Sequence, residues 1–479
     1  MKAYSAIVKL TLRNAVRSHV FQLLLLFLIL CVGLVPTTVG GGTATDFIRV
    51  SLSYSLWGVG AILSLSALWV GCHVMSADID SYQLHMVVAK PVSRVTVWLA
   101  KWTGVVLLHL FLLGLSAAAI YGVVTWRFDH GNFPAAERDR IRSEVLVGRR
   151  VFLPRQPDYQ ELAQELAKQK ILDRQKRGVV LDLSPKAQER ILKSCLKEVM
   201  TQASEIPPGR QRAWVYENVP RHSDKPLFLR YRPYVGRVSS ERQRMTRVHW
   251  FVGVPRPRKG DAGNDGNDTG REEAGKREYF MYPMTPRPEQ LMSGEFHELR
   301  LRGEWGVVTP DNEVMICVFN ADPAQANHYY QPADGPKILI EVTGFLGNYL
   351  RGVLVLAMQI ILMAALSCAF GGFLTLPTAV FVTSSYLLFG AISVFMTDRD
   401  YYVNGATDRV GQFVARWLLK VVIPLQSFDV TDLIAGGELV EWGQIWFLSW
   451  FYLLCRALPL VLIGIYFYWR RELGLAIRK

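Results

Sequence analysis

Long apolar runs occupy both ends of the chain, whereas its middle is charged and interrupted by proline and glycine. A helix needs about 20 mostly apolar residues to cross a bilayer. Six stretches meet this length, and we predict a transmembrane helix over each of 19–40, 53–75, 96–125, 349–371, 375–396 and 445–469. The residues before the first stretch have the pattern of an amphipathic helix, which favours a retained span over a cleaved signal peptide.

The middle of the chain, about 126–346, predicts a water-soluble insert. Apolar residues at helical spacing predict one helix over about 158–177 and a second that starts at Ser184-Pro185. Further on, short runs rich in β-branched and aromatic residues alternate with turn signals, which is typical of strands. These runs favour a jelly-roll-like β-sandwich over 210–345, and they lie at 213–216, 227–231, 248–252, 279–282, 296–301, 314–319 and 338–342.

The expected fold class is an all-α membrane domain of six transmembrane helices with an extracytoplasmic α+β insert. Residues 1–125 hold the N-terminal interfacial helix, three spans and a short helix over 76–94. Residues 126–346 hold the insert, with helices over 158–204 before the β-sandwich. Residues 347–479 hold three further spans and an amphipathic segment over 404–435, which is either a lid over the outer end or an interfacial anchor.

Basic residues predict the orientation of the spans, because Lys and Arg concentrate in cytoplasmic loops. With both termini inside, the inner face holds eleven basic and three acidic residues, and the short outer loops hold five basic and eight acidic ones. We therefore expect an inner-membrane protein whose termini are cytoplasmic and whose insert is periplasmic or extracellular. This topology and the basic insert account for the net charge of +13, so no nucleic-acid partner is expected.

The predicted cytoplasmic loop between spans 2 and 3 has the pattern of a short amphipathic helix. Ser76 is in the position of an N-cap, and Asp78 and Asp80 suit the first turn of a helix. Leu84 belongs to an apolar stripe, and Pro91 would end the helix. Such a helix either docks a cytoplasmic partner or only anchors the loop at the membrane surface.

The same loop resembles that of ABC-transporter permeases of the type-2, exporter-like class. The resemblance rests on an acidic pair, a leucine-rich turn, the run Lys90-Pro91-Val92-Ser93-Arg94 and a later Lys-x-x-Gly, and it covers about 255 residues. It implies that the loop docks a separate ATPase subunit, which would carry ATP and Mg, and that two permease subunits form a homodimer or pseudo-dimer. It also implies coupling roles for Asp78, Asp80, Leu84, Pro91 and Arg94. The large insert departs from typical members of the class.

The function expected from this resemblance is export or extrusion of a substrate across the inner membrane. The alternative is an ATP-driven mechanical regulator of an envelope enzyme or partner, without transport. The chain lacks G-x-x-x-x-G-K-[ST] and shows no catalytic or metal-ligand motif, so we expect neither enzymatic activity nor a cofactor of its own. The insert would contact an envelope protein or a glycan, if Tyr231, Trp250, Tyr329 and Tyr330 are exposed and not packed in its core.

Three polar residues fall within the predicted spans. Arg456 either faces the interior of the helix bundle or extends to the outer interface, because an arginine at mid-bilayer is costly. His73 and His109 are expected to have structural roles. In the insert, Cys195 and Cys317 form one disulfide or remain two buried thiols.

Overall fold

The structure of the chain is a computed structural model. It describes residues 2–38, 40, 42–80, 92–177, 185–221, 225–235, 245–255, 279–301, 307–322, 326–331, 334–397, 410–411, 413–414, 417 and 422–470. The chain forms two compact units. One comprises Met1–Gly148 with Thr343–Lys479 and is helical, and the other, Arg149–Val342, contains most of the β-structure.

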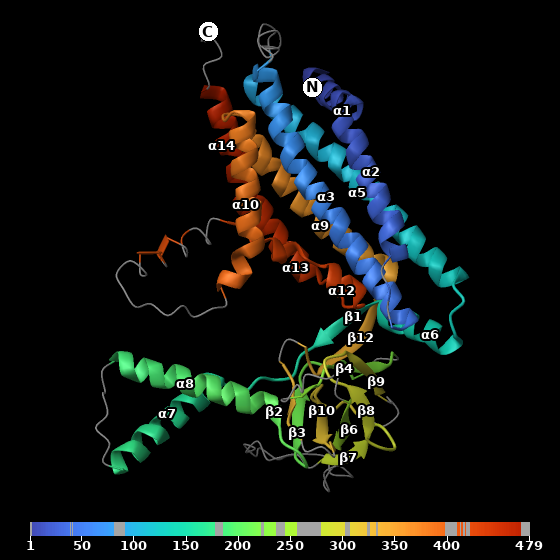
Figure 1. The fold of residues 1–479 in the computed structure, drawn as a ribbon, viewed down its shortest axis with the longest axis vertical. Helices are drawn as coiled ribbons and strands as arrows, with labels where there is room; N and C mark the ends of the chain where they lie inside the picture. The colour runs from blue at the N-terminus through green and yellow to red at the C-terminus, as the bar shows by residue number, and fades with distance from the viewer. Residues whose placement is uncertain are drawn as a thin grey trace, which may run out of the picture. The chain divides into compact units, whose positions relative to one another are not determined.

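Among its described residues, the helical unit contains five helices that are long and apolar enough to span a membrane; Figure 1 shows how its helices are arranged. The five helices are α2 (His19–Thr38), α3 (Ala44–Asp80), α5 (Arg94–His130), α9 (Phe345–Gly371), and the continuous run of α13 (Trp442–Leu448), η4 (Ser449–Ala457) and α14 (Leu458–Arg470). The predicted fifth stretch forms α10 (Leu376–Thr397), whose described apolar part, 376–392, is shorter. The chain is thus a membrane protein, and a sixth span stays a prediction.

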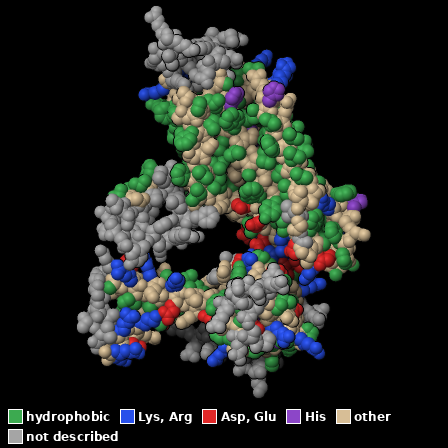
Figure 2. All heavy atoms as spheres, in the orientation of Figure 1, with side chains coloured by type: hydrophobic (Ala, Val, Ile, Leu, Met, Phe, Trp, Pro, Cys, Tyr) green, Lys and Arg blue, Asp and Glu red, His purple; other side chains and the backbone are tan. Residues whose placement is uncertain are grey.

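Shorter elements complete this unit. The amphipathic helix expected at the N-terminus is α1 (Lys2–Arg17). Between α5 and the second unit lie α6 (Ala135–Arg140) and the π-helical turn η1 (Ile141–Val145), and before α13 lie η3 (Leu425–Phe428) and α12 (Thr431–Ala435). Hydrophobic side chains cover the long helices on the face drawn in Figure 2, as a lipid environment requires.

Close packing of α3 against α9 forms the centre of the helical unit. A Cβ on Gly71 would lie 1.9 Å from the Ser367 hydroxyl oxygen, and a Cβ on Gly371 would lie 2.8 Å from the Cα of Cys72. The two backbones therefore approach to a distance that only glycine allows. Small residues at helix interfaces are typical of membrane helices, because close contact replaces the hydrophobic driving force there.

Two antiparallel helices in the second unit confirm the helices predicted from the sequence. They are α7 (Tyr159–Lys176) and α8 (Pro185–Ser204). Asp158 caps α7, because its carboxylate accepts hydrogen bonds from the backbone amides of Gln160 and Glu161. A small core of Ala163, Ala167 and Cys195 lies between the two helices.

Three sheets make up the rest of this unit. In the first, β12 (Lys337–Gly344) lies between β1 (Val147–Phe152) and β4 (Leu227–Tyr231), and β9 (His297–Leu301) is at the far edge. In the second, β10 (Val314–Asn320) pairs antiparallel with β3 (Gln211–Tyr216) and β6 (Met245–Pro255), and β6 also pairs with β7 (Tyr279–Pro283) and β8 (Glu289–Met292). The third consists of β2 (Glu205–Ile206), β11 (His328–Tyr329) and β5 (Tyr234–Val235).

Alternate residues of the first two sheets share one hydrophobic core. The first sheet contributes Leu229 and Ile338, and the second contributes Val252 and Ile316. All seven predicted strands form, and they include β4 with the predicted bounds. The strands β1, β2, β5, β8 and β11 were not predicted from the sequence.

The aromatic residues considered for glycan or protein binding lie mostly in this core. Tyr231, Trp250 and Tyr330 are buried, and the rings of Tyr231 and Trp250 lie 4.6 Å apart. Of the two alternatives given for these three residues, core packing is the one that the structure shows, and their apolar surface is taken up by the core. Tyr329 is half-buried and donates a hydrogen bond to Glu205. Cys195 and Cys317 are both buried free thiols, so the disulfide alternative is wrong.

Candidate functional site

The candidate site is the end of the helical unit at which α3 ends and α5 begins, which we call the loop end. The helix α1 and the end of α14 lie at the same end (Figure 1). Asp78 and Asp80 belong to the last turn of α3, and Leu84 and Pro91 lie outside the described residues. The segment 76–94 is therefore described only at its two attachments.

The attachment to α5 is a capped helix start. The Ser93 side chain accepts a hydrogen bond from the backbone amide of Thr96 at 3.2 Å, which satisfies one of the free amides at the beginning of α5. Arg94, the first residue of α5, donates a hydrogen bond of 2.8 Å from Nη1 to the backbone carbonyl of Trp469 in α14. This bond joins the start of α5 to the end of the last predicted span.

The attachment to α3 differs from the prediction. Ser76 does not cap a new helix, because α3 continues without a break to Asp80. Its hydroxyl donates to the backbone carbonyl of Gly371, at the end of α9, at 3.2 Å. A serine inside a membrane helix can satisfy its hydroxyl in this way, so it need not end the helix. The segment 76–94 is thus joined to α9 through α3.

His109 lies in the interior of the helical unit. The ring is buried between α5 and α3, with Nδ1 2.8 Å from the Val105 carbonyl and Nε2 3.1 Å from the Ser66 hydroxyl. Both ring nitrogens therefore have partners within the bundle. His73 is exposed on α3, beside a cavity described below.

Arg456 lies in the π-helical segment η4 and is half-buried. Its guanidinium lies over the ring of Phe451, 5.5 Å from the centroid. This cation–π contact offsets part of the cost of placing a charge among apolar side chains. Single stretches of π-helix are frequent at functional sites, so Arg456 remains a candidate for function.

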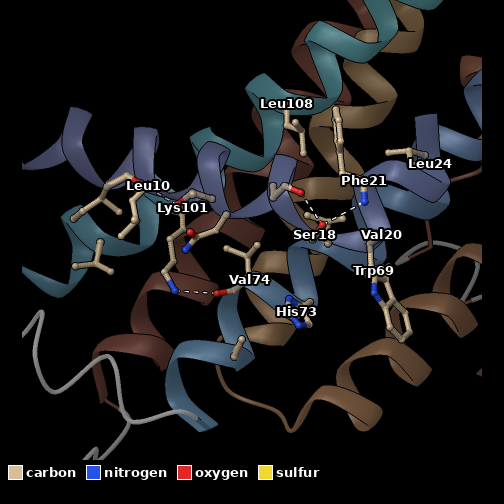
Figure 3. Close-up of a pocket in the computed structure, with 17 residues that line it drawn as sticks. Leu10, Ser18, Val20, Phe21, Leu24, Trp69, His73, Val74, Lys101 and Leu108 are labelled. Atoms are coloured by element: carbon tan, nitrogen blue, oxygen red, sulfur yellow. Dashed lines mark hydrogen bonds between the residues drawn. The ribbon is translucent and has the colours of Figure 1, made fainter. Parts of the chain in front are cut away.

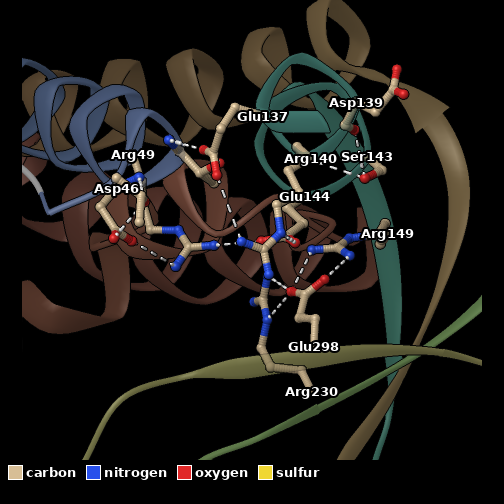
Figure 4. A network of polar contacts seen from close by, with 12 residues as sticks. Asp46, Arg49, Glu137, Asp139, Arg140, Ser143, Glu144, Arg149, Arg230 and Glu298 are labelled. Carbon is tan, nitrogen blue, oxygen red and sulfur yellow. Dashed lines mark hydrogen bonds and ion pairs between the residues drawn. The ribbon is translucent and has the colours of Figure 1, made fainter. Parts of the chain in front are cut away.

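Charged residues cluster at the opposite end of the helical unit, where α3 begins (Figure 4). The hydroxyl of Thr45 donates to Glu137 at 3.0 Å, and Arg49 lies 3.6 Å from Glu144, so both pairs join α3 to the α6–η1 segment. Asp432 of α12 accepts a hydrogen bond of 2.8 Å from Ser53. This cluster was not predicted from the sequence, although the spacing of Glu137, Arg140 and Glu144 is that of ion pairs along one helix. Of the predicted 404–435 segment, residues 404–409, 412, 415–416 and 418–421 lie outside the described residues.

The second unit contains one buried carboxylate shared by two arginines (Figure 4). Arg149 forms two hydrogen bonds with Glu298, of 2.7 and 3.0 Å, and Arg230 contacts the same carboxylate. The exposed fractions of the Arg149 and Glu298 side chains are 0% and 6%. Burial raises the pKa of Glu298, but the charges of Arg230 and Arg149 outweigh it and bring the pKa down to about 2.

This group was not predicted from the sequence, because its members come from three separate strands, β1, β4 and β9. Its only sequence signal is a charged residue in an otherwise apolar strand, as at Arg230. The group joins β1 and β9, which are the two edges of the first sheet, to β4. We therefore assign it a structural role.

The described residues include no group of three or more His, Cys, Asp or Glu side chains that could hold a metal ion. Comparisons with protein-family models, with curated proteins and with solved structures return no match.

Proposed function

We propose that this protein is the membrane subunit of an ATP-driven transporter, and that segment 76–94 docks a separate ATPase subunit. The proposal is supported by the acidic pair and the Lys-Pro-Val-Ser-Arg run, which resemble the docking loop of type-2 ABC permeases. The two attachments of this segment add a physical argument. A loop that transmits force must be joined firmly to the helices that it moves.

The contacts at the loop end meet this requirement. Displacement of the docking segment would act on α14 through the Arg94–Trp469 hydrogen bond. It would act on α9 through Ser76 and through the close approach of Gly371 to Cys72. Because densely packed interiors transmit strain, α3 and α9 would move as one body.

The proposed assembly contains two copies of this chain and two ATPase subunits in the inner membrane. ATP and Mg bind to the ATPase subunits. Each copy has six spans, which are the five long apolar helices and α10. The second unit, with its β-sandwich and helical pair, lies on the periplasmic or extracellular side of the membrane. There it receives the substrate or an envelope partner.

The test uses the double variant Asp78→Ala/Asp80→Ala in the full chain, purified from its native membranes. The wild type should retain a stoichiometric subunit that hydrolyses Mg-ATP, and the double variant should lose about tenfold or more of that activity. Asp129→Ala/Asp139→Ala is the matched control, since it removes two exposed acids far from the loop end, one in the last turn of α5 and one in α6, and should leave the activity unchanged. Equal activity in both double variants, or a wild-type chain that purifies without an ATPase, would contradict the docking role.

A second experiment tests whether the second unit handles the substrate. Replacing 149–342 by a short Gly-Ser linker removes the second unit but leaves the docking segment intact. A transporter should keep basal ATP hydrolysis and lose its stimulation by membrane or envelope extracts. If the extracts stimulate both forms equally, the second unit has no part in handling the substrate.

A further inference from the structure

A cavity of about 200 Å³ lies at the loop end, between the amphipathic helix α1 and the long helices α2, α3 and α5 (Figure 3). Apolar side chains form most of its wall, among them Leu10, Phe21, Leu24, Trp69 and Leu108. The cavity has room for several methylene groups, and its apolar wall favours a hydrocarbon chain over ordered water.

Polar and apolar groups occupy different depths of this cavity. Lys101 is seven residues from the start of α5, and Leu108 is seven residues further along the same helix. With a rise of 1.5 Å per residue, these two positions differ by about 10 Å along the helix axis. On α3, His73 likewise lies nearer to the loop end than Trp69. The two basic or titratable side chains of the lining on α3 and α5, His73 and Lys101, therefore lie nearer to the loop end than the large apolar side chains of Trp69 and Leu108.

The charge of this site is positive. Lys101 is only 5% exposed, and its Nζ is held at the wall of the cavity by a hydrogen bond of 2.8 Å to the Val74 carbonyl. The lining residues that the structure describes include no Asp or Glu. The neighbouring helix α1 carries Lys2, Lys9, Arg13 and Arg17 and no acidic residue. An anion beside Lys101 would offset the cost of burying its ammonium group.

We propose that this cavity binds one acidic phospholipid of the surrounding membrane. The phosphate lies beside Lys101, and one acyl chain extends along Phe21, Leu24 and Leu108. A phospholipid fits both parts of the site, since it joins an anionic headgroup to a hydrocarbon chain. Basic pockets between membrane helices are known binding places for such headgroups. The proposal needs only that the chain is a membrane protein, and it is independent of the docking role.

The bound lipid would contact α1, α2, α3 and α5 together. The helix α1 is already joined to α5 by the hydrogen bond between the hydroxyls of Tyr4 and Thr103, at 2.6 Å, and by the contact of Thr11 with Gly104. A lipid in the cavity would strengthen this junction. Membrane composition would then affect the same end of the bundle that carries the docking segment.

The test is native mass spectrometry of the full chain released from nanodiscs. The nanodiscs contain equal amounts of phosphatidylglycerol and phosphatidylcholine with identical acyl chains. The wild type should retain one phosphatidylglycerol in preference to phosphatidylcholine. Lys101→Gln should reduce this preference about fivefold, which is the effect of one basic residue near a membrane surface.

Arg470→Gln is the matched control, because it removes one exposed charge at the loop end but outside the cavity. It should keep the wild-type preference. If Lys101→Gln does not fold, Asn14→Asp provides the same test, since it places a negative charge at an exposed position of the cavity wall. Equal retention of the two lipids by the wild type would overturn the proposal, and so would equal losses in Lys101→Gln and Arg470→Gln.

Discussion

Arg94 and Trp469 are 375 residues apart in the chain, and yet the Arg94 side chain donates a hydrogen bond of 2.8 Å to the Trp469 carbonyl. The carbonyls in the last turn of a helix have no partner within the helix, so a cation is favourable at this position. The helix α5 belongs to the first stretch of chain in the helical unit, Met1–Gly148, and α14 belongs to the second, Thr343–Lys479. This bond therefore joins the segment that we propose as the docking site to both stretches.

Arg94→Gln should loosen the end of α14. Loss of a hydrogen bond of this kind costs about 1 kcal/mol, so amide hydrogen exchange over 466–470 should become about fivefold faster. Arg94→Lys should give an intermediate rate, because lysine keeps the charge but lacks the forked donors of arginine. Unchanged exchange in Arg94→Gln would show that the bond does not hold the helix end.

Gly371→Ala should destabilise the helical unit. The new methyl group would lie 2.8 Å from the Cα of Cys72, and backbone atoms cannot move aside without separating α3 from α9. We expect a loss of about 1–3 kcal/mol, measured as a lower midpoint of thermal unfolding in detergent. Gly114→Ala is the control, because no atom lies within 4 Å of its Cβ position and alanine favours a helix. Equal midpoints for the two variants would contradict the close packing.

Glu298→Gln should destabilise the second unit strongly. It leaves the guanidinium groups of Arg149 and Arg230 buried without the carboxylate, and breaking a buried ion pair costs about 3–5 kcal/mol. The check is protease susceptibility of the full chain in increasing urea. Glu341→Gln is the control, since Glu341 pairs with Lys225 at the surface, where such pairs contribute about 1 kcal/mol or less. Equal effects of the two variants would be evidence against a buried ion pair.

The same carboxylate predicts a pH dependence. The pKa of Glu298 falls from 4.5 to about 2 on folding. Its contribution to stability is therefore complete above about pH 4.5 and is lost as the pH falls toward 2. The stability difference between the wild type and Glu298→Gln should shrink by roughly 3 kcal/mol over this range, at about 1.4 kcal/mol per pKa unit. A difference that stays constant between pH 5 and pH 2 would contradict the low pKa.

Periodic patterns predicted the main elements of the fold, because an element that is buried on one face has apolar residues at a regular spacing in its own sequence. The amphipathic helix α1, the helices α7 and α8 and the seven strands were found in this way. The missed strands β2, β5 and β11 have two residues each, too few to show a period. The strand β1 contains Arg149 and Arg150, and its charged residues concealed it from a search for apolar runs.

The details of the candidate site depend on contacts between distant parts of the chain. The role of Ser76 was wrongly predicted because its acceptor, the Gly371 carbonyl, is 295 residues away. A serine followed by two acids is typical of a helix start, and only the neighbouring helix α9 makes a continuous helix favourable here. Likewise, no local pattern shows that Lys101 lines a cavity, since its partners come from α1, α2 and α3.

The strands by which the chain enters and leaves the second unit, β1 and β12, are neighbours in one sheet. Gly148 and Thr343, at their ends, are so close that a Cβ on Gly148 would lie 2.6 Å from the threonine methyl group. The chain thus enters and leaves the second unit through a stem of two adjacent strands, β1 and β12. Such a stem allows a whole folded module to be gained, exchanged or lost in one genetic event, while the membrane helices on either side keep their connection.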